Sequence, residues 1–312
     1  MIITHSSLDC FKSCRRKYKL RYLDGIVSKQ KSESLEFGSR MHELLEQYLN
    51  HIKAVQAFNG DLDDGKALEA IEEKVIANME ASPVDSAKLL GLIRGYIRKY
   101  YNADATEYDV HFVEKEFNLT TPYSDTDLKL IRIAGKVDGV VQSKDDQRFF
   151  IVEHKTASNV DDAYVAQKDI DSQTMMYALC LEQSLGIQVS GVIHDIIIKQ
   201  KIRQKKGESE EEFCDRLIND VTDENFIRIV VDIDRDRLNE FKDEFDASCS
   251  DLSQCRNFYK CTGNCLGRFG ACDYLALCRA GGLVDSVRDL YEKRREHEEL
   301  SVGIINQGGN NE

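Results

Sequence analysis

The sequence predicts a mixed α/β protein with a helical N-terminal lobe and a cysteine-rich C-terminal segment. Helical periodicity fills the first third of the chain, strand and helix patterns alternate through the middle, and cysteines cluster near the end. The 312 residues suit one large domain or two smaller ones. We expect a helical lobe at 1–105, a sheet-containing core at 106–252, a cysteine segment at 253–282, and a polar helix and tail at 283–312.

Four helical patterns define the N-terminal lobe. Apolar residues recur with helical spacing in 6–24 and in 37–52. Two further helices are expected at 64–80 and 85–102, separated at Pro83.

Strands enter where the hydrophobic period shortens. β-forming residues dominate 109–119, 128–143 and 148–157, and the polar turn 144–147 makes the last two an antiparallel hairpin. The elements expected after the hairpin are a helix at 161–185, a strand at 190–200, a helix at 209–221, a strand at 226–234 and helices at 235–252 and 285–300. Strands interleaved with helices predict a mixed sheet flanked by helices.

Composition indicates an ordinary soluble protein located in the cytoplasm. No apolar run approaches the ~20 residues of a membrane span, and the N-terminus lacks a secretory signal. The net charge of −13 argues against nonspecific nucleic-acid binding. Basic runs at 14–22 and 199–206 nevertheless keep DNA open as a partner, with Arg15, Arg16 and Lys17 as candidate contacts.

Two carboxylates and a lysine meet on the predicted hairpin. Asp138 lies near the end of one strand, whereas Glu153 and Lys155 lie two apart, and so on one face, of the other. Neighbouring carboxylates repel one another unless a cation lies between them, and Mg²⁺ suits such oxygen ligands. The alternative is that Asp138 is a turn residue and Glu153 and Lys155 form a surface ion pair.

Three further polar residues can join this group. Gln173 and Tyr177 lie four apart, on one face of a predicted helix. His42 lies on an N-terminal helix, where a histidine is either structural or, if it faces the carboxylates, a metal ligand. A histidine ligand would make Mn²⁺ competitive with Mg²⁺.

Several stretches together resemble the RecB-like branch of the PD-(D/E)XK nucleases. The matching stretches are "GKVDGVV", "FFIVEHKTAS", "QTMMY", "FGSRMHELLE" and "SLDCFKSCRRKYKLRYLDG". The resemblance implies a restriction-endonuclease-like core and metal-dependent cleavage of DNA. It also implies roles for individual residues: Asp138, Glu153 and His42 as metal ligands, Lys155 as the catalytic lysine, Gln173 and Tyr177 as site support or DNA contacts, Glu114 as a possible supporting acid, and His154 without a role.

The cysteines predict a metal or cluster site. Five of the ten fall within 255–278, and soft thiolates at loop spacing suit zinc or an iron–sulfur cluster. The chain is similar here to AddB-type and CRISPR-adaptation nucleases, which take one cysteine from near the N-terminus and three from the C-terminus. This similarity implies a structural [4Fe–4S] cluster, with zinc as the alternative. The implied ligands are Cys14, Cys265, Cys272 and Cys278, with Cys261 as a competitor for Cys265.

These observations predict a Mg²⁺- or Mn²⁺-dependent exonuclease acting on single-stranded DNA or DNA ends. One alternative is a non-catalytic DNA-binding or assembly subunit. Another is a nuclease of the CRISPR-adaptation type, or of recombination or replication, that works with protein partners. The sequence lacks the GxxxxGK[ST] phosphate loop, so it does not predict an ATP motor in this chain.

Overall fold

The protein is described from a computed structural model covering residues 1–30, 33–58, 64–77, 82–124, 130–267, 270–295, 297 and 300. The chain divides into two compact units. The terminal unit gathers Met1–Ser32, Glu116–Lys136 and Asp236–Glu312, and the central unit gathers Glu33–Lys115 and Val137–Arg235. The four-part division expected from the sequence stays a prediction.

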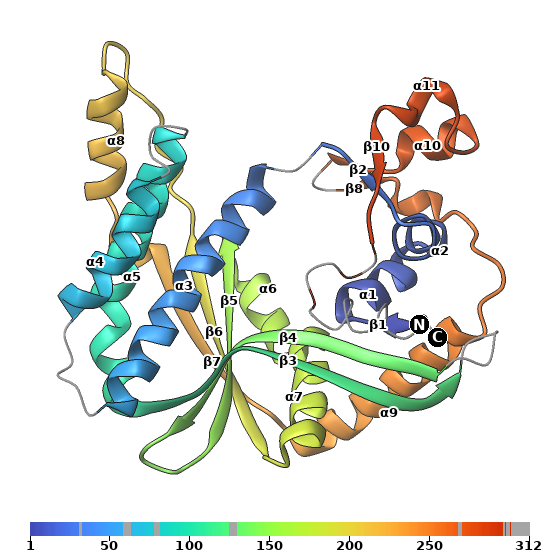
Figure 1. The fold of residues 1–312 in the computed structure, drawn as a ribbon, viewed down its shortest axis with the longest axis horizontal. Coiled ribbons are helices and arrows are strands. Elements are labelled where there is room, and N and C mark those ends of the chain that lie inside the picture. The colour runs from blue at the N-terminus through green and yellow to red at the C-terminus, as the bar shows by residue number, and fades with distance from the viewer. Residues whose placement is uncertain are drawn as a thin grey trace, which may run out of the picture. The chain divides into compact units, whose positions relative to one another are not determined.

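Within the described residues, six strands form the main sheet (Figure 1). The strands are β1 (Ile2–Ile3), β3 (Tyr108–Ser124), β4 (Leu130–Ser143), β5 (Phe149–Ala157), β6 (Val189–Ile198) and β7 (Phe226–Asp232). Their order is β1-β4-β5-β6-β7, and β3 also pairs with β4. The pairs β1–β4 and β5–β6 are parallel, whereas β4–β5 and β6–β7 are antiparallel. This mixed sheet confirms the predicted α/β class.

The β4–β5 hairpin was predicted from the polar turn, and the structure confirms it. The turn closes through backbone hydrogen bonds from Ser143 N to Arg148 O (2.9 Å) and from Gln147 N to Ser143 O (2.9 Å). Pairing then sets Gly139 opposite Val152. This register brings Asp138 to the start of the charged end of β5.

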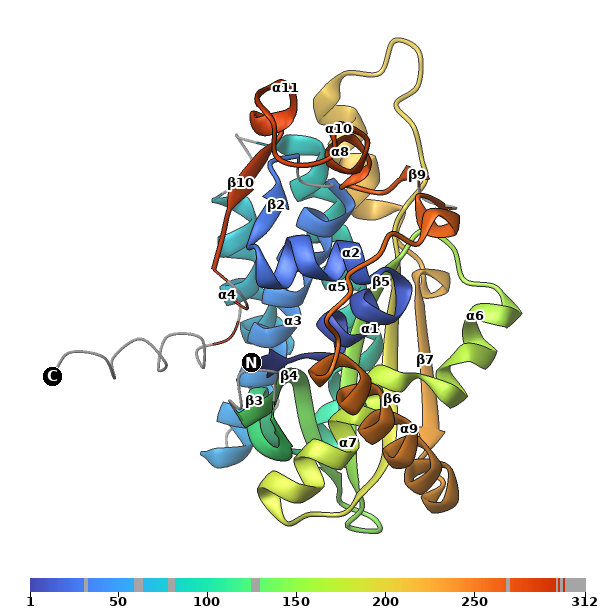
Figure 2. The same cartoon turned by 90° about the vertical axis from the view of Figure 1, so that its right-hand side faces the viewer.

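Helices cover both faces of β5, β6 and β7 in the central unit (Figures 1 and 2). One face carries α3 (Glu33–Ala57), α4 (Asp64–Ile76), α5 (Pro83–Glu107) and α8 (Glu210–Asn219). The other face carries α6 (Asp162–Ala166), the 3-10 turn η2 (Gln167–Ile170) and α7 (Ser172–Leu185). A 3-10 turn, η3 (Asp223–Asn225), precedes β7.

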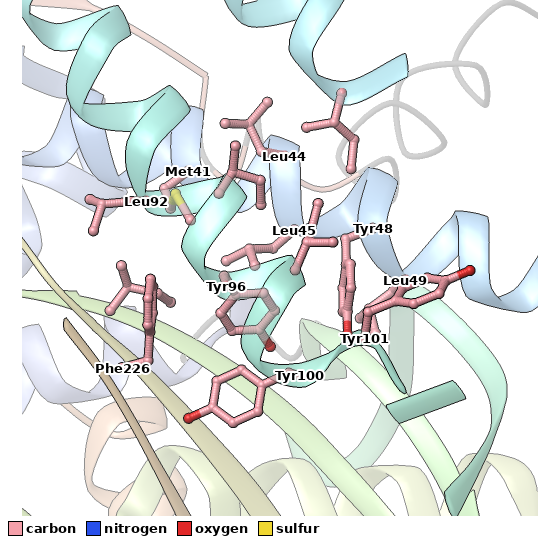
Figure 3. Close-up of a cluster of buried hydrophobic side chains, with 14 of the residues drawn as sticks. Met41, Leu44, Leu45, Tyr48, Leu49, Leu92, Tyr96, Tyr100, Tyr101 and Phe226 are labelled. Carbon is pink, nitrogen blue, oxygen red and sulfur yellow. The ribbon is translucent and has the colours of Figure 1, made fainter. Parts of the chain in front are cut away.

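The main core of the central unit lies between α3, α5 and the sheet. Figure 3 shows Tyr48, Tyr96 and Tyr101 packed together with leucines of α3. The rings of Tyr48 and Tyr96 meet edge to face, with centroids 5.2 Å apart. The core therefore carries several phenol hydroxyls, and each one that is buried needs a hydrogen-bond partner.

The terminal unit joins the two ends of the chain. Its N-terminal elements are α1 (His5–Ser13), α2 (Arg15–Tyr18), the π-turn η1 (Lys19–Leu23) and β2 (Ile26–Ser28). Its C-terminal elements are α9 (Arg235–Ser253), η4 (Thr262–Asn264), β8 (Leu266–Gly267), β9 (Gly270–Ala271), α10 (Leu275–Ala280), α11 (Asp285–Arg288) and β10 (Tyr291–Lys293). None of the described helices in either unit is long and apolar enough to cross a bilayer.

Three predicted helices differ from the structure. The helix expected at 6–24 breaks at Cys14, whose backbone is extended (φ −161°, ψ 107°). The helix expected at 161–185 breaks at Asp171, whose side chain caps α7 by accepting from Gln173 N at 2.9 Å.

The helix expected at 285–300 is wrong over its described part. It shrinks to α11, and Tyr291–Lys293 instead pairs with β2. Tyr291 is buried there and donates its hydroxyl to Asp273 O at 2.7 Å. This tertiary pairing overrides the helical preference of the charged sequence that follows.

Candidate active site

Asp138 lies at the centre of a set of hydrogen-bond donors supplied by β5 and α3. Its Oδ2 accepts from His154 N at 2.8 Å. The Nδ1 atoms of His42 and His154 each lie 3.4 Å from the same oxygen. The hairpin register and α3 together place His42 beside the Asp138 carboxylate. The sequence left open whether His42 faces the carboxylates, and the structure shows that it does.

Glu153 and Lys155 form an ion pair that Gln173 joins from α7. Lys155 Nζ lies 2.5 Å from Glu153 Oε1 and donates to Gln173 Oε1 at 3.0 Å. The Gln173 amide donates to Glu153 Oε1 at 3.1 Å and to the Tyr177 hydroxyl at 3.0 Å. The bonds of this amide bridge the acid and the base and fix the distance between them.

Burial and charge act in opposite directions on these groups. Burial raises the pKa of Asp138, but hydrogen bonds from His154 and His42 outweigh it and hold this pKa well below its usual range. Burial also raises the pKa of Glu153, and the Lys155 charge only partly offsets this. Burial lowers the pKa of Lys155, but the Glu153 charge more than compensates and raises it.

The pKa of His42 rises above its ordinary value. Burial lowers it, whereas the hydrogen bond to Asp138 and the charges of Asp138 and Glu153 raise it by more. A site that raises the pKa of a histidine in this way attracts positive charge.

The donor set fits a hard divalent cation. Two buried or half-buried carboxylates, Asp138 and Glu153, are close enough for the charge of Asp138 to raise the pKa of Glu153. Carboxylate oxygens are the ligands that Mg²⁺ and Mn²⁺ favour. Among the described residues, no three His, Cys, Asp or Glu side chains already converge on a single point as metal ligands. The charge of Lys155, whose Nζ lies 2.5 Å from Glu153 Oε1, favours the ionised form of Glu153.

His154 was expected to have no role, and that expectation is not tested; the structure shows what surrounds its side chain. Strand alternation puts its side chain on the face opposite Glu153 and Lys155. On that face the ring is buried against Asp138 and against Tyr96, whose hydroxyl lies 3.5 Å from His154 Nε2. The sequence signal was a histidine inside an apolar strand, because a buried imidazole needs polar partners.

A buried polar network continues from Tyr96. Its hydroxyl donates to Asp195 Oδ2 at 2.6 Å. Arg228 donates to both oxygens of Asp195 at 2.7 Å and also binds both oxygens of Asp104. Asp104 in turn accepts from Tyr48 at 2.7 Å. Asp195 stands in the apolar stretch "VIHDIII", where a charge signals a buried partner that the sequence alone cannot identify.

Glu114 lies on β3 with a positive φ of 49°, which is uncommon for a residue other than glycine. Its supporting role stays a prediction.

The predicted cluster cysteines come together in the terminal unit. Cys14, Cys261, Cys265, Cys272 and Cys278 all line one cavity of about 350 Å³. Cys261 N donates to Cys14 Sγ at 3.4 Å, and Cys272 N donates to Cys265 O at 2.9 Å. None of these cysteines forms a disulfide.

All three basic candidates for DNA contact have local contacts in the terminal unit, and Arg16 N donates to Tyr259 O at 3.0 Å. The Arg15 guanidinium lies over the rings of Phe11 (4.9 Å) and Tyr259 (5.1 Å). Lys17 lines the cysteine cavity. Arg16 is half-buried. DNA binding by these residues stays a prediction.

Comparison with known protein families gives a match over most of the chain. Residues 2–279 match the family described as the PD-(D/E)XK nuclease superfamily, whose members typically use Mg²⁺ or Mn²⁺. No curated protein matches the chain.

Two solved structures are similar to the chain at low sequence identity. One is a candidate exonuclease from Eubacterium rectale, with 13% identity, a TM-score of 0.47, and coverage of 98% of this chain and 93% of that one. Another is SSO0001, with 11% identity, a TM-score of 0.27, and coverage of 69% of this chain and 77% of that one. The mixed sheet flanked by helices matches the predicted restriction-endonuclease-like fold.

Proposed function

We propose, since this chain belongs to the PD-(D/E)XK nuclease superfamily, that it is a metal-dependent exonuclease acting on single-stranded DNA or DNA ends. The observation that carries the proposal is the joining of Glu153, Lys155 and Gln173 by direct contacts next to Asp138. Glu153 is 3% exposed, so the pair is not a surface ion pair. Burial of a carboxylate costs free energy unless the group is paired and hydrogen-bonded, and Lys155 and Gln173 supply these contacts.

Asp138 and Glu153, with His42, would hold Mg²⁺ or Mn²⁺. When bound, such a cation supplies a more acidic water and stabilises negative charge on phosphorus. With Glu153 holding the cation, Lys155 would donate to a phosphate oxygen or orient a water. Gln173 would help to hold Lys155 at the site, because its Oε1 accepts from Lys155 Nζ at 3.0 Å.

A basic loop after β6 supports DNA binding at the same edge of the sheet. Lys201, Arg203, Lys205 and Lys206 are exposed on this loop. Because β5 and β6 are parallel, the loop begins beside the charged end of β5, where Lys199 N donates to Ala157 O at 2.8 Å. Cations at this edge can neutralise the phosphates that flank the scissile bond.

We also propose a [4Fe–4S] cluster held by Cys14, Cys265, Cys272 and Cys278, with zinc as the alternative. These four cysteines and Cys261 line one cavity of about 350 Å³, a volume that has room for a multi-iron group. Cys261 remains the competitor for Cys265, because it lines the same cavity and its backbone N lies 3.4 Å from Cys14 Sγ.

The cluster would act as a structural staple. It would close a loop of about 250 residues, and a cross-link of that span stabilises by about 5 kcal/mol on the chain-entropy argument.

Linear and circular single strands, incubated with the protein and Mn²⁺ or Mg²⁺, test the proposal. We expect release of nucleotides from the end-labelled linear strand and no cutting of the circle. Cutting of both forms would indicate an endonuclease. Binding without release of nucleotides under either metal would favour the non-catalytic assembly subunit. Cytoplasmic location and protein partners stay predictions.

A further inference from the structure

The group that holds Asp138 in place is the variable residue of the Glu-x-Lys motif, His154. Three contacts fix one carboxylate oxygen, and two of them come from this single residue: its backbone N–H at 2.8 Å and its ring Nδ1 at 3.4 Å. The ring is 1% exposed, so no water competes for Asp138 on this side.

The ring itself is held from behind. Tyr96 packs edge to face against it, with centroids 6.1 Å apart and planes at 73°. The Tyr96 hydroxyl commits its proton to Asp195 Oδ2 at 2.6 Å, so it presents only a lone pair to His154. The ring thus lies between two acceptors, and the carboxylate is the stronger one. This favours the tautomer in which Nδ1–H points to Asp138.

Asp195, which accepts from Tyr96, is itself bound on its other side. It is fully buried, and Arg228 binds both of its oxygens in a two-point contact. The Arg228 guanidinium is itself held by Asp104 and lies 4.0 Å from the centroid of the Tyr100 ring. The chain of contacts therefore ends at Tyr100, which belongs to the buried core shown in Figure 3.

We propose that His154 is a positioning residue for Asp138, held in place by the Tyr96–Asp195–Arg228 network. It keeps the Asp138 carboxylate in one rotamer, ready for the divalent cation, before any cation arrives. This inference rests on the proposed function, because it assigns a partner to a proposed metal ligand. Polar groups behind a metal ligand typically change metal affinity 10- to 100-fold when removed.

Mn²⁺ binding to purified full-length variants without DNA tests this inference. The amide nitrogen of asparagine stands as many bonds from Cβ as Nδ1, and that of glutamine as many as Nε2. His154→Leu and His154→Gln should therefore weaken Mn²⁺ binding at least 10-fold, whereas His154→Asn should stay within about threefold of wild type. Every variant keeps the backbone N–H bond to Asp138, so the difference reports the ring. Free Mn²⁺ is measured by electron paramagnetic resonance.

A loss shared equally by the asparagine and glutamine variants would overturn the inference, as would wild-type affinity in the leucine variant. Tyr96→Phe provides a second arm that leaves His154 intact. It should weaken Mn²⁺ binding about threefold or more, and unchanged affinity would remove the network from the account. Asp138→Ala distinguishes a failure of the proposed metal site from a failure of the proposed positioning role. If this variant binds Mn²⁺ as wild type does, the proposed metal site itself is wrong. If Asp138→Ala loses Mn²⁺ while His154→Leu keeps it, only the positioning role fails.

Discussion

Removing the Lys155 charge should leave the buried carboxylate of Glu153 without its counter-ion. We consider Lys155→Met, which keeps the length of the side chain and deletes the ammonium that lies 2.5 Å from Glu153 Oε1. In the metal-free protein, Glu153 is then either an unpaired buried carboxylate or a neutral, protonated carboxyl. The protonated form has the lower free energy, because an unpaired buried charge is strongly unfavourable.

The cost of protonation sets the size of the effect. For a carboxyl with an ordinary pKa of 4.5, conversion to the neutral form costs about 3 kcal/mol at pH 7 and about 1 kcal/mol at pH 5. Because burial raises the folded-state pKa of Glu153, the loss of stability grows as the pH rises above 4.5. We expect Lys155→Met to lower the free energy of unfolding by up to about 3 kcal/mol at pH 7 and by clearly less at pH 5.

Denaturant unfolding of metal-free protein at pH 5 and pH 7 measures this difference. The matched control is the double variant Glu153→Gln/Lys155→Met, in which no charge remains to be neutralised. Its stability should differ little between the two pH values relative to wild type. A loss in Lys155→Met that is the same at both pH values, or that persists undiminished in the double variant, would refute the assignment of a charged, buried pair.

Three further predictions concern the other parts of the account. The variant Lys205→Glu/Lys206→Glu should weaken binding of single-stranded DNA and reduce the slope of log affinity against log salt by about 0.7 per lost phosphate contact. The control is Lys242→Glu on α9, whose lysine side chain is 58% exposed and whose substitution should change neither quantity. Filter binding between 50 and 200 mM salt measures both. Protein purified without oxygen should absorb visible light and contain iron. Cys272→Ser and Cys265→Ser should each abolish both signals, whereas Cys261→Ser should keep them. Loss of both signals in Cys261→Ser, with retention in Cys265→Ser, would exchange the assignments of these two cysteines. The pKa of His42 is raised above 6.5, so its imidazolium should stabilise the metal-free protein below pH 6.5 and lose that contribution as the pH rises through the folded-state pKa. In thermal unfolding, His42→Gln should be less stable than wild type at pH 6, by about 1 kcal/mol or less. At pH 8.5 its stability should be closer to that of wild type.

Most elements of the fold follow from local patterns in the sequence. The hairpin is an example, because the polar turn before Arg148 and the apolar runs on either side specify both strands and their antiparallel pairing. The breaks at Cys14 and Asp171 were missed, although an aspartate that caps a helix is a readable signal. The β2–β10 pairing was not predictable, because it joins residues more than 260 positions apart.

The candidate site also contains residues whose placement the sequence predicts and residues whose placement it does not. Glu153, Lys155 and their shared face follow from strand alternation, and the helical spacing of Gln173 and Tyr177 predicts that they lie together. The contacts of His154 do not follow from the sequence, because alternation assigns its side chain to the far face without identifying the residues packed there. The partners on that face, Tyr96 and Asp195, come from α5 and β6. Only tertiary structure brings them to the ring.

The most direct test of the central claim is a paired measurement of cleavage and binding. Wild type, Asp138→Ala and Lys155→Ala are each incubated with end-labelled single-stranded DNA, with and without Mn²⁺. We expect wild type to release nucleotides only with metal, and both variants to bind the DNA without cutting it. Metal-dependent cleavage retained by both variants would contradict the assignment of Asp138, Glu153 and Lys155 as the active site.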